Sequence, residues 1–422
     1  MKKKYLGNNV IMGNIVLNKF ITALTLGVNS GLNYALIDTL ITAYFNDARI
    51  NLVVIGILSL RLIPYYIRCL WAPIVDRVSI KLFPKDFGHR KGWTLFTQAI
   101  LIVLVVILSF INITDKFILT VIIIFIIAFT AATYDISMEA YRIELFEKSA
   151  LNLGSSYTVV GFRIGLLISG AFGLYLSSIL SWQYTFIIIS LFIIPCMGIV
   201  LFSKDINIQT QGDYRLKQEF WLSFKSLFKQ PMFTFVFVII SFYKVSDGYL
   251  DTMILPFLME TGFSKGEIAS VNSVMRLIAS ICGTFVGGYI VRNAIKAKHL
   301  FYTEILAALT NLLFIFLIKI GHNIKVLVGI VCVESFCSGI CNIMLINYMS
   351  NLCNKRFVGT HYAILISISG FSRFILASTS GFVAVNLGWY NFFIVSALLS
   401  IPSLLCIYWL YIYKRNSILP YF

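Results

Sequence analysis

The sequence predicts an all-α polytopic membrane protein, with twelve transmembrane helices in two six-helix pseudo-repeats. Its composition is 59% hydrophobic and 12% charged, whereas soluble domains are about 25% charged. Apolar stretches of about twenty residues recur along the chain, and each is long enough to cross a hydrocarbon core of about 30 Å as a helix. The expected spans are 16–40, 51–72, 92–112, 117–141, 155–180, 183–203, 231–258, 266–291, 299–319, 325–352, 360–385 and 389–413. The first span is too long for a signal peptide and lacks a small-residue cleavage site, so it counts as a helix.

The net charge of +16 is distributed as a membrane topology requires. With the N-terminus inside, the inward loops collect Lys2–Lys4, Arg77, Lys81, Lys85, Arg90, Lys91, Lys204, Arg215, Lys217, Lys225, Lys229, Arg292, Lys296, Lys298, Lys355, Arg356, Lys414 and Arg415. The outward loops hold only Arg49, Lys116, Lys265, Lys319 and Lys325. This asymmetry predicts that both termini are cytoplasmic. It also explains the basicity without a nucleic-acid partner.

The eight cysteines and four histidines form no pattern typical of a metal site or a nucleophilic active site. Cys337 and Cys341 are four residues apart on an apolar helix with no histidine nearby, which favours free packing thiols. The sequence therefore predicts no metal, no cofactor and no enzyme activity. It indicates no obligate protein partner; the expected contacts are membrane lipid, a substrate and protons.

A polar segment in the middle of the chain divides it into two halves. We expect a six-helix bundle at 1–203, a cytoplasmic linker with an amphipathic helix at 204–230, and a second bundle at 231–422. The halves resemble each other faintly, because Asp38-Thr39-Leu40-Ile41 ends the first span and Asp251-Thr252-Met253-Ile254 lies in the seventh. In span eight, Gly283, Gly287 and Gly288 predict a small-residue face for close helix packing.

Three charged residues lie near the inner end of span four. Asp135, Glu139 and Arg142 are spaced i, i+4, i+7, so a helix presents them on one face. A charge inside a bilayer costs roughly 2.5–3.5 kcal/mol on insertion scales unless it faces a partner or a watery cavity, so such residues usually mark an ion or substrate pathway. A solvated helix end is the alternative for Glu139 and Arg142. Arg163, at comparable depth in span five, is a candidate counter-ion, so Asp135, Glu139 and Arg163 form the expected proton-coupling set.

The loop after span two carries a second signal. Ala72-Pro73-Ile74-Val75-Asp76-Arg77 is followed by Gly88-His89-Arg90-Lys91-Gly92. This pattern resembles the cytoplasmic loop between helices two and three of major facilitator transporters. The resemblance implies a gate latch, with Asp76, Arg77 and Arg142 as gate residues; the alternative is a plain basic inward loop.

Several segments spread through both halves together resemble the AmpG family of muropeptide permeases. They are Leu70-Trp71-Ala72-Pro73 with Asp76-Arg77, Ala131–Arg142, Tyr243-Lys244, and Cys353-Asn354-Lys355-Arg356-Phe357 before Tyr362-Ala363. The resemblance implies the major facilitator fold in the bacterial inner membrane. It also implies proton-driven import of N-acetylglucosaminyl-1,6-anhydro-N-acetylmuramyl peptides for cell-wall recycling. Glu139 departs from the aspartate that the family often has, and Arg276 is an unexpected charge in span eight.

Other charges within the spans fit such a substrate. Lys244, Asp247 and Asp251 share one face of span seven, and Arg61 and Tyr65 lie near the middle of span two. Glu334 and Arg373 add single charges, and an internal ion pair between them is equally open. Arginine binds carboxylates bidentately, while lysine and the acids suit a zwitterionic peptide stem. We expect these seven residues to form the substrate site.

Three other functions are compatible with a polytopic membrane protein. Within transport, the alternative substrate is another bulky anion such as acetyl-CoA. A membrane-embedded acyl- or glycosyltransferase would need a catalytic His, Asp or metal motif at the interface, and the sequence has none. A non-transporting sensor would not need the many paired charges within the spans. The favoured function is a secondary transporter that works by alternating access.

Overall fold

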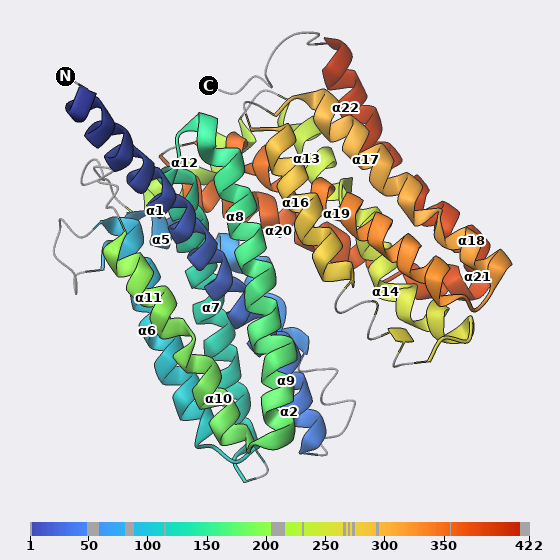
Figure 1. Cartoon of the computed structure of the whole chain (residues 1–422), viewed down its shortest axis with the longest axis horizontal. Helices are drawn as coiled ribbons and strands as arrows, with labels where there is room; N and C mark the ends of the chain where they lie inside the picture. Colours follow the sequence, from blue (N-terminus) through green and yellow to red (C-terminus); the bar gives the residue numbers. More distant parts are fainter. Residues whose placement is uncertain are drawn as a thin grey trace. The chain divides into compact units, whose positions relative to one another are not determined.

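The computed structural model describes residues 2–48, 59–80, 88–113, 115–203, 216–229, 232–264, 267–268, 271, 275–292, 295–354 and 356–413. Throughout these residues the regular structure is helical (Figure 1). Ten helices in the described part are long and apolar enough to cross a membrane, and Arg276–Ile290 is a shorter apolar helix. The predicted all-α membrane fold is therefore confirmed. The predicted span 51–72 lies partly outside the described residues, as does the start of span 266–291.

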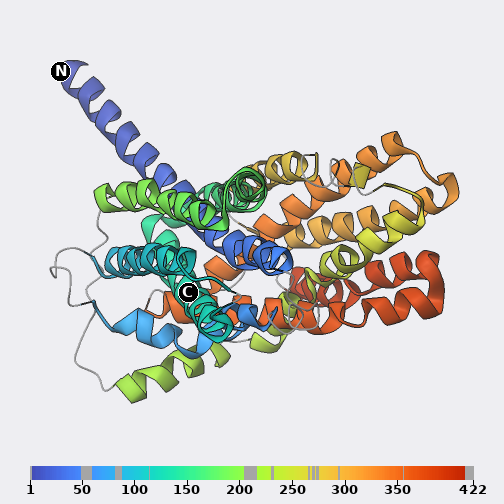
Figure 2. The ribbon, with the colours of Figure 1, turned by 90° about the horizontal axis from the view of Figure 1, so that it is seen from below.

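The chain forms two compact units. The first contains Met1–Phe224 and Asn354–Ala363, and the second contains Lys225–Cys353 and Ile364–Phe422. Within each unit the long helices run side by side (Figures 1 and 2). The predicted bundle boundaries at 203 and 231 remain a prediction.

The first unit is built from long helices and short helical pieces. Its elements are α1 (Lys2–Ala35), η1 (Leu36–Leu40), α2 (Ile41–Asp47), η2 (Ser59–Leu62), α4 (Ile63–Ile67), η3 (Arg68–Leu70), α5 (Ala72–Arg77), α6 (His89–Ser109), α7 (Phe117–Leu145), α8 (Lys148–Leu166), η5 (Leu167–Phe172), α9 (Gly173–Ile179), α10 (Trp182–Leu191), α11 (Ile193–Phe202) and most of α12 (Leu216–Phe228). The described part of span two is thus a series of short turns and not one helix. Pro64 and Pro73 each stand at the beginning of one of these turns, where the missing N–H costs no helical bond.

The second unit is also built from long helices and shorter helical pieces. Its elements are α13 (Phe233–Phe242), α14 (Val245–Glu260), α16 (Arg276–Ile290), α17 (Ala297–Asn311), α18 (Phe314–Ile320), α19 (Ile324–Leu352), most of α20 (Val358–Ala377), α21 (Ser380–Leu398) and α22 (Ile401–Tyr413). The first turn of α20 belongs to the first unit. Span seven is interrupted at Tyr243–Lys244, between α13 and α14.

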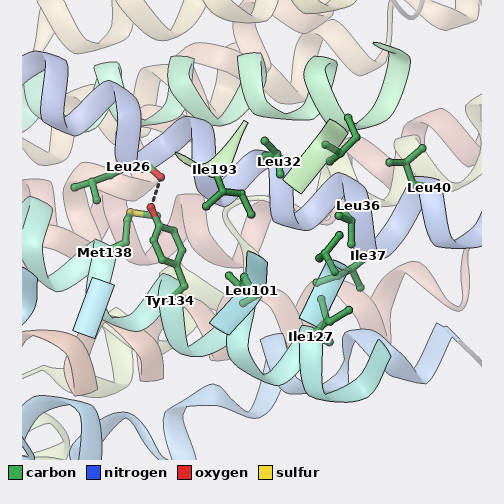
Figure 3. Close-up of a cluster of buried hydrophobic side chains, with 14 of the residues drawn as sticks. Leu26, Leu32, Leu36, Ile37, Leu40, Leu101, Ile127, Tyr134, Met138 and Ile193 are labelled. Atoms are coloured by element: carbon green, nitrogen blue, oxygen red, sulfur yellow. Dashed lines mark hydrogen bonds between the residues drawn. The ribbon is translucent and has the colours of Figure 1, made fainter. Parts of the chain in front are cut away.

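The core of the first unit lies among α1, α6, α7 and α10–α11. Figure 3 shows Leu26, Leu32 and Ile193 packed with Tyr134 and Met138. The Tyr134 hydroxyl donates a hydrogen bond of 2.9 Å to the Leu26 carbonyl oxygen, so the one polar atom of this buried ring has an acceptor. This hydrogen bond joins α7 to α1 directly before Asp135, the first of the charged residues of α7.

Glycines allow the closest helix pair of the first unit. α1 packs along α8, and a Cβ on Gly27 or Gly31 would lie 2.0 Å from the Thr158 or Phe162 carbonyl oxygen. Gly161 and Gly165 meet α1 in the same way. Two G-x-x-x-G patterns therefore face each other, an arrangement that lets backbones approach closely in membranes.

The second unit repeats this device between α16 and α19. A Cβ on Gly283 would lie 2.0 Å from the Phe336 carbonyl oxygen, and one on Gly339 would lie 2.4 Å from the Ser280 carbonyl oxygen. A Cβ on Gly287 would lie 2.5 Å from Ile343. The small-residue face predicted for span eight is thus confirmed at Gly283 and Gly287.

Candidate functional site

Asp76, at the end of α5, contacts the beginning of α20. It is 4% exposed. Its carboxylate accepts hydrogen bonds from the backbone N–H of Gly359 at 3.1 Å, from the backbone N–H of Thr360 at 2.7 Å and from the Thr360 hydroxyl at 2.6 Å. A helix N-terminus presents free N–H groups and a partial positive charge, so it stabilises a carboxylate at this position.

Arg90 supplies the full positive charge of this cluster. Its Nη1 lies 2.7 Å from Asp76 Oδ1, while its Nε and Nη2 each lie 3.0 Å from Glu144 Oε1. The three side chains are nearly buried. Two carboxylates therefore share one guanidinium, and Asp76 alone also binds the helix N-terminus, so that its partners compensate its buried charge.

The other two predicted gate residues lie nearby in the same unit. The Arg77 guanidinium stacks 5.0 Å from the Phe357 ring centroid. Arg142 is fully buried: it binds Glu139 at 2.8 and 2.7 Å, donates to the Ser155 hydroxyl, and lies 5.5 Å from the Tyr362 ring centroid. Because Arg142 has no exposed surface, the alternative of a solvated helix end does not hold for it.

Asp135 forms a separate ion pair. It accepts a hydrogen bond of 2.7 Å from the Ser30 hydroxyl of α1 and lies 3.2 Å from Arg68 Nη1. The expected counter-ion, Arg163 of α8, is not the described partner of Asp135. Tyr65 is three residues before Arg68, and its ring packs against Tyr34 with centroids 5.7 Å apart. The sequence did not indicate that Arg68 and Ser30 are the partners of Asp135. Arg68 follows Arg61 at a spacing of seven residues, which a helix would place on one face.

Arg61 binds the backbone of span one. Its Nε donates to the Ile37 carbonyl oxygen at 2.7 Å, and its Nη2 donates to the Asp38 carbonyl at 3.0 Å and the Thr42 hydroxyl at 2.5 Å. These acceptors lie in or just after the π-helical turn η1, where a wider turn changes the carbonyl pairing. The geometry thus gives Arg61 a role in holding this turn.

Lys244 lies at the interruption of span seven. Its ammonium is 2.6 Å from Asp247 Oδ2 and 3.0 Å from the Ser338 hydroxyl, which itself donates to Asp247 Oδ2 at 2.7 Å. Both charges are more than nine-tenths buried. The helix break places the Lys244 backbone outside regular α-geometry, and interrupted helices of this kind often line the binding sites of transporters.

A second group of charges continues from Asp251. Arg276 lies 2.5 Å from Asp251 and 3.5 Å from Glu334, and Ser335 donates to Glu334 at 2.9 Å. Glu334 is buried, whereas Asp251 and Arg276 are partly exposed. The cation beside Glu334 is thus Arg276, and the alternative ion pair between Glu334 and Arg373 is not the one that the structure describes. The Arg373 side chain instead covers Gly248, where an added Cβ would lie 2.4 Å from Arg373 Cγ.

The structure therefore brings most of the predicted residues together in three groups, one in the first unit and two in the second. Asp76, Arg77, Glu139 and Arg142 lie toward one end of the first unit with the beginning of α20, and Asp135 is one turn away from Glu139. Lys244 and Asp247 form one contact group of the second unit, and Asp251 and Glu334 form another through Arg276. Ionisable residues within membrane spans make these groups candidates for a functional site.

Comparison with known proteins identifies the fold and the family. The Major Facilitator Superfamily profile matches residues 20–377 and 253–418. Among solved structures, FucP in the outward conformation has a TM-score of 0.71 at 16% identity, covering 94% of this chain and 97% of FucP. The human organic anion transporter MFSD10 has a TM-score of 0.70 at 12% identity, covering 92% and 99%. At these identities the two structures support the fold alone.

The chain belongs to the Major Facilitator Superfamily, a class of membrane transporters. Its curated relatives include three Rickettsia proteins, each named "Putative transporter AmpG". The protein of Rickettsia conorii is 32% identical, with 90% of this chain and 94% of the relative covered. The proteins of Rickettsia bellii and Rickettsia typhi are each 31% identical, with 90% and 93% of this chain and 95% of each relative covered. Within the superfamily, the chain is a member of the AmpG family.

Proposed function

We propose that this protein is a proton-coupled importer of anhydro-muropeptides in the bacterial inner membrane, with both termini in the cytoplasm. The observation that carries the proposal is the buried Lys244–Asp247 ion pair at a break in a membrane-spanning helix, in a chain of the AmpG family. The substrate would be N-acetylglucosaminyl-1,6-anhydro-N-acetylmuramic acid carrying a peptide. Its transport would supply a cytoplasmic recycling route for cell-wall fragments.

Recognition follows from the chemistry of this substrate. A muropeptide stem carries several carboxylates and an amine, and these groups match a lysine and acids held near each other. A substrate carboxylate can replace Asp247 as the partner of Lys244, while Asp247 and Asp251 remain acceptors for the stem amine. Because Lys244 and Asp247 neutralise each other in the empty site, the carrier avoids an unpaired buried charge before substrate arrives.

Proton coupling is assigned to Asp135. Its ion pair with Arg68 and its bond from Ser30 hold it charged when the pair is closed. Protonation removes the attraction to Arg68 and frees the guanidinium for other acceptors. Glu139 and Arg163 would assist from the next turn and from α8.

Alternating access needs a contact that forms in one state only, and Asp76 is suited to this role. Its three hydrogen bonds to the first turn of α20 and its ion pair with Arg90 are directional and specific. Rocking of two six-helix bundles, at 1–203 and 231–422, would break these contacts as a unit. Arg77 and Arg142 would stabilise the same closed contact, through their cation–π contacts with Phe357 and Tyr362.

Counterflow in proteoliposomes tests the proposal. Purified protein is reconstituted with unlabelled anhydro-muropeptide inside, and uptake of the labelled compound is followed with and without an imposed pH gradient. We expect exchange without the gradient and accumulation with it, acid outside. Acetyl-CoA serves as the competing substrate. Exchange of acetyl-CoA without exchange of muropeptide would replace the proposed substrate with another bulky anion.

A further inference from the structure

Glu304 of α17 is a buried carboxylate that has no cation beside it among the described residues. It has no exposed surface. Its Oε1 accepts a hydrogen bond from the Ser403 hydroxyl of α22, while its Oε2 is buried without a hydrogen-bond partner in the part of the chain that the structure describes. Asp76, Asp247 and Glu334, which are also buried, and Asp135, which is partly buried, each lie within 4.0 Å of a lysine or arginine nitrogen.

An ionised carboxylate is costly in such surroundings. Transfer of an isolated charge into a medium of low dielectric constant is so unfavourable that the group takes up a proton instead. One hydroxyl donor compensates only a fraction of the charge, because a carboxylate accepts about four hydrogen bonds when ionised. The geometry therefore favours the acid form of Glu304, with its carbonyl oxygen accepting from Ser403.

The elements packed around α17 carry titratable groups, but none of their described cations forms an ion pair with Glu304. Tyr243 and Asp247 approach from the interruption of span seven, Cys341 from α19 and Cys406 from α22. From α21, Ser396 binds Asn311 of α17 at 3.2 Å. Asp247 lies on α14, which packs against α17, and its charge is negative. The balance of charge near Glu304 thus depends on whether Lys244 neutralises Asp247.

A direct structural link joins the two places. The Tyr243 hydroxyl lies 2.7 Å from the Thr303 hydroxyl and 3.5 Å from the Leu300 carbonyl oxygen. Thr303 precedes Glu304 on α17, and Tyr243 precedes Lys244 at the helix interruption. The helix interruption that carries Lys244 is therefore bonded, through Tyr243, to the helix that carries Glu304.

We propose that Glu304 is a proton-binding site of the second unit, coupled to the occupancy of Lys244. This inference rests on the proposed function for its ligand, an anionic peptide stem. When the anion takes Lys244 from Asp247, the uncompensated aspartate favours the proton on Glu304; when the anion leaves, Lys244 returns to Asp247 and the proton is released more easily. No covalent bond changes, and the proton is exchanged with water in a state that opens this region, because Glu304 is closed to solvent here.

Infrared spectroscopy of the purified protein tests the protonation of Glu304 without any substrate. The spectrum of each variant is subtracted from that of the wild type. At neutral pH the wild type should show a carboxylic-acid carbonyl band that Glu304→Gln removes. Ser403→Ala should shift the same band to higher frequency, because the acid carbonyl loses its donor. Glu267→Gln, at an exposed carboxylate bonded to Ser264, is the matched control and should leave the band unchanged. A spectrum that neither Glu304→Gln nor Ser403→Ala alters would overturn the proposal.

Calorimetric titration with anhydro-muropeptide tests the coupling. If the bound anion tightens the hold of Glu304 on its proton, Kd should rise by up to about tenfold per pH unit over the alkaline range in which the empty protein has lost this proton and the liganded protein keeps it, by reciprocal linkage. Glu304→Gln should lower this slope by about one proton relative to wild type, and any slope that remains belongs to Asp135. An unchanged slope would refute the coupling even where wild type binds and transports. Wild-type protein that binds no muropeptide would instead refute the proposed substrate, and the infrared result would still decide the protonation of Glu304.

Discussion

Gly359 lies against Asp76, 283 residues away in sequence, with its backbone N–H 3.1 Å from the carboxylate. A Cβ at position 359 would be 2.6 Å from Asp76 Oδ1. The beginning of α20 can therefore approach Asp76 this closely only because residue 359 has no side chain. The contact depends on a single glycine as much as on the charged residue that sequence patterns single out.

The first prediction is that Gly359→Ala weakens this contact. The added methyl group must displace the Asp76 carboxylate from the two N–H donors, and overpacking of this kind typically costs about 1–3 kcal/mol. Thermal unfolding in detergent should show a lower Tm than wild type. Gly329→Ala is the matched control, because no atom lies within 4 Å of a Cβ built on Gly329 of α19, and its Tm should equal or exceed that of wild type. Equal stability of both variants would contradict this account.

Asp76→Asn tests the latch separately from packing. The amide keeps the size of the side chain but removes the ion pair with Arg90 and weakens the bonds from the first turn of α20. We expect slower transport and a changed balance between inward- and outward-open states, with substrate selectivity unchanged. Labelling of single cysteines from each side of the membrane measures this balance. Wild-type labelling together with a wild-type rate would reduce the loop to a topological signal.

Asp135→Asn should separate exchange from accumulation. The neutral amide cannot gain or lose the proton, and Arg68 then has no carboxylate partner at 3.2 Å. Uphill uptake under an imposed pH gradient should fall to background, while counterflow should continue at a reduced rate. Asp115→Asn, at an exposed position bonded to Asn112, is a suitable control. Normal accumulation by Asp135→Asn would remove Asp135 from the coupling mechanism.

The sequence was sufficient for the fold because a bilayer leaves few alternatives. Backbone groups in hydrocarbon must be satisfied internally, so long apolar stretches become helices, and ten such helices lie in the described residues. The interruption of span seven at Tyr243–Lys244 was not predicted. The break at Tyr243–Lys244 follows a strongly apolar stretch, with no glycine or proline at the break itself.

The partners of charged residues were harder to predict than their positions. Spacing along one helix correctly placed Glu139 with Arg142 and Lys244 with Asp247, because both pairs are three residues apart. Partners on different helices depend on tertiary packing, which spacing does not encode. Arg68 reaches Asp135 across 67 residues, and Arg276, not Arg373, lies beside Glu334. Glu304 was overlooked because one acid in an apolar span gives no pattern.

The last prediction concerns Lys244 and Asp247. Among the described residues, Lys244→Ala leaves the buried Asp247 carboxylate with only the Ser338 hydroxyl as a donor, and breaking a buried pair from one side costs about 3–5 kcal/mol. Tm should fall, and binding of a peptide-bearing anhydro-muropeptide should be lost. An exposed ion pair contributes only about 0–1 kcal/mol. A loss of unfolding free energy well above that range would therefore show that the Lys244–Asp247 pair is buried.

The double variant Lys244→Ala with Asp247→Ala separates recognition from stability. Removing both charges relieves the unpaired carboxylate, so Tm should recover relative to Lys244→Ala. Binding should not recover, because the cation that receives the substrate carboxylate is gone. Calorimetric titration in detergent with the peptide-bearing substrate and with the peptide-free disaccharide makes the comparison, since the disaccharide should depend less on Lys244. Wild-type affinity of the double variant for the peptide-bearing substrate would mean that the pair is structural and that recognition lies elsewhere in the chain.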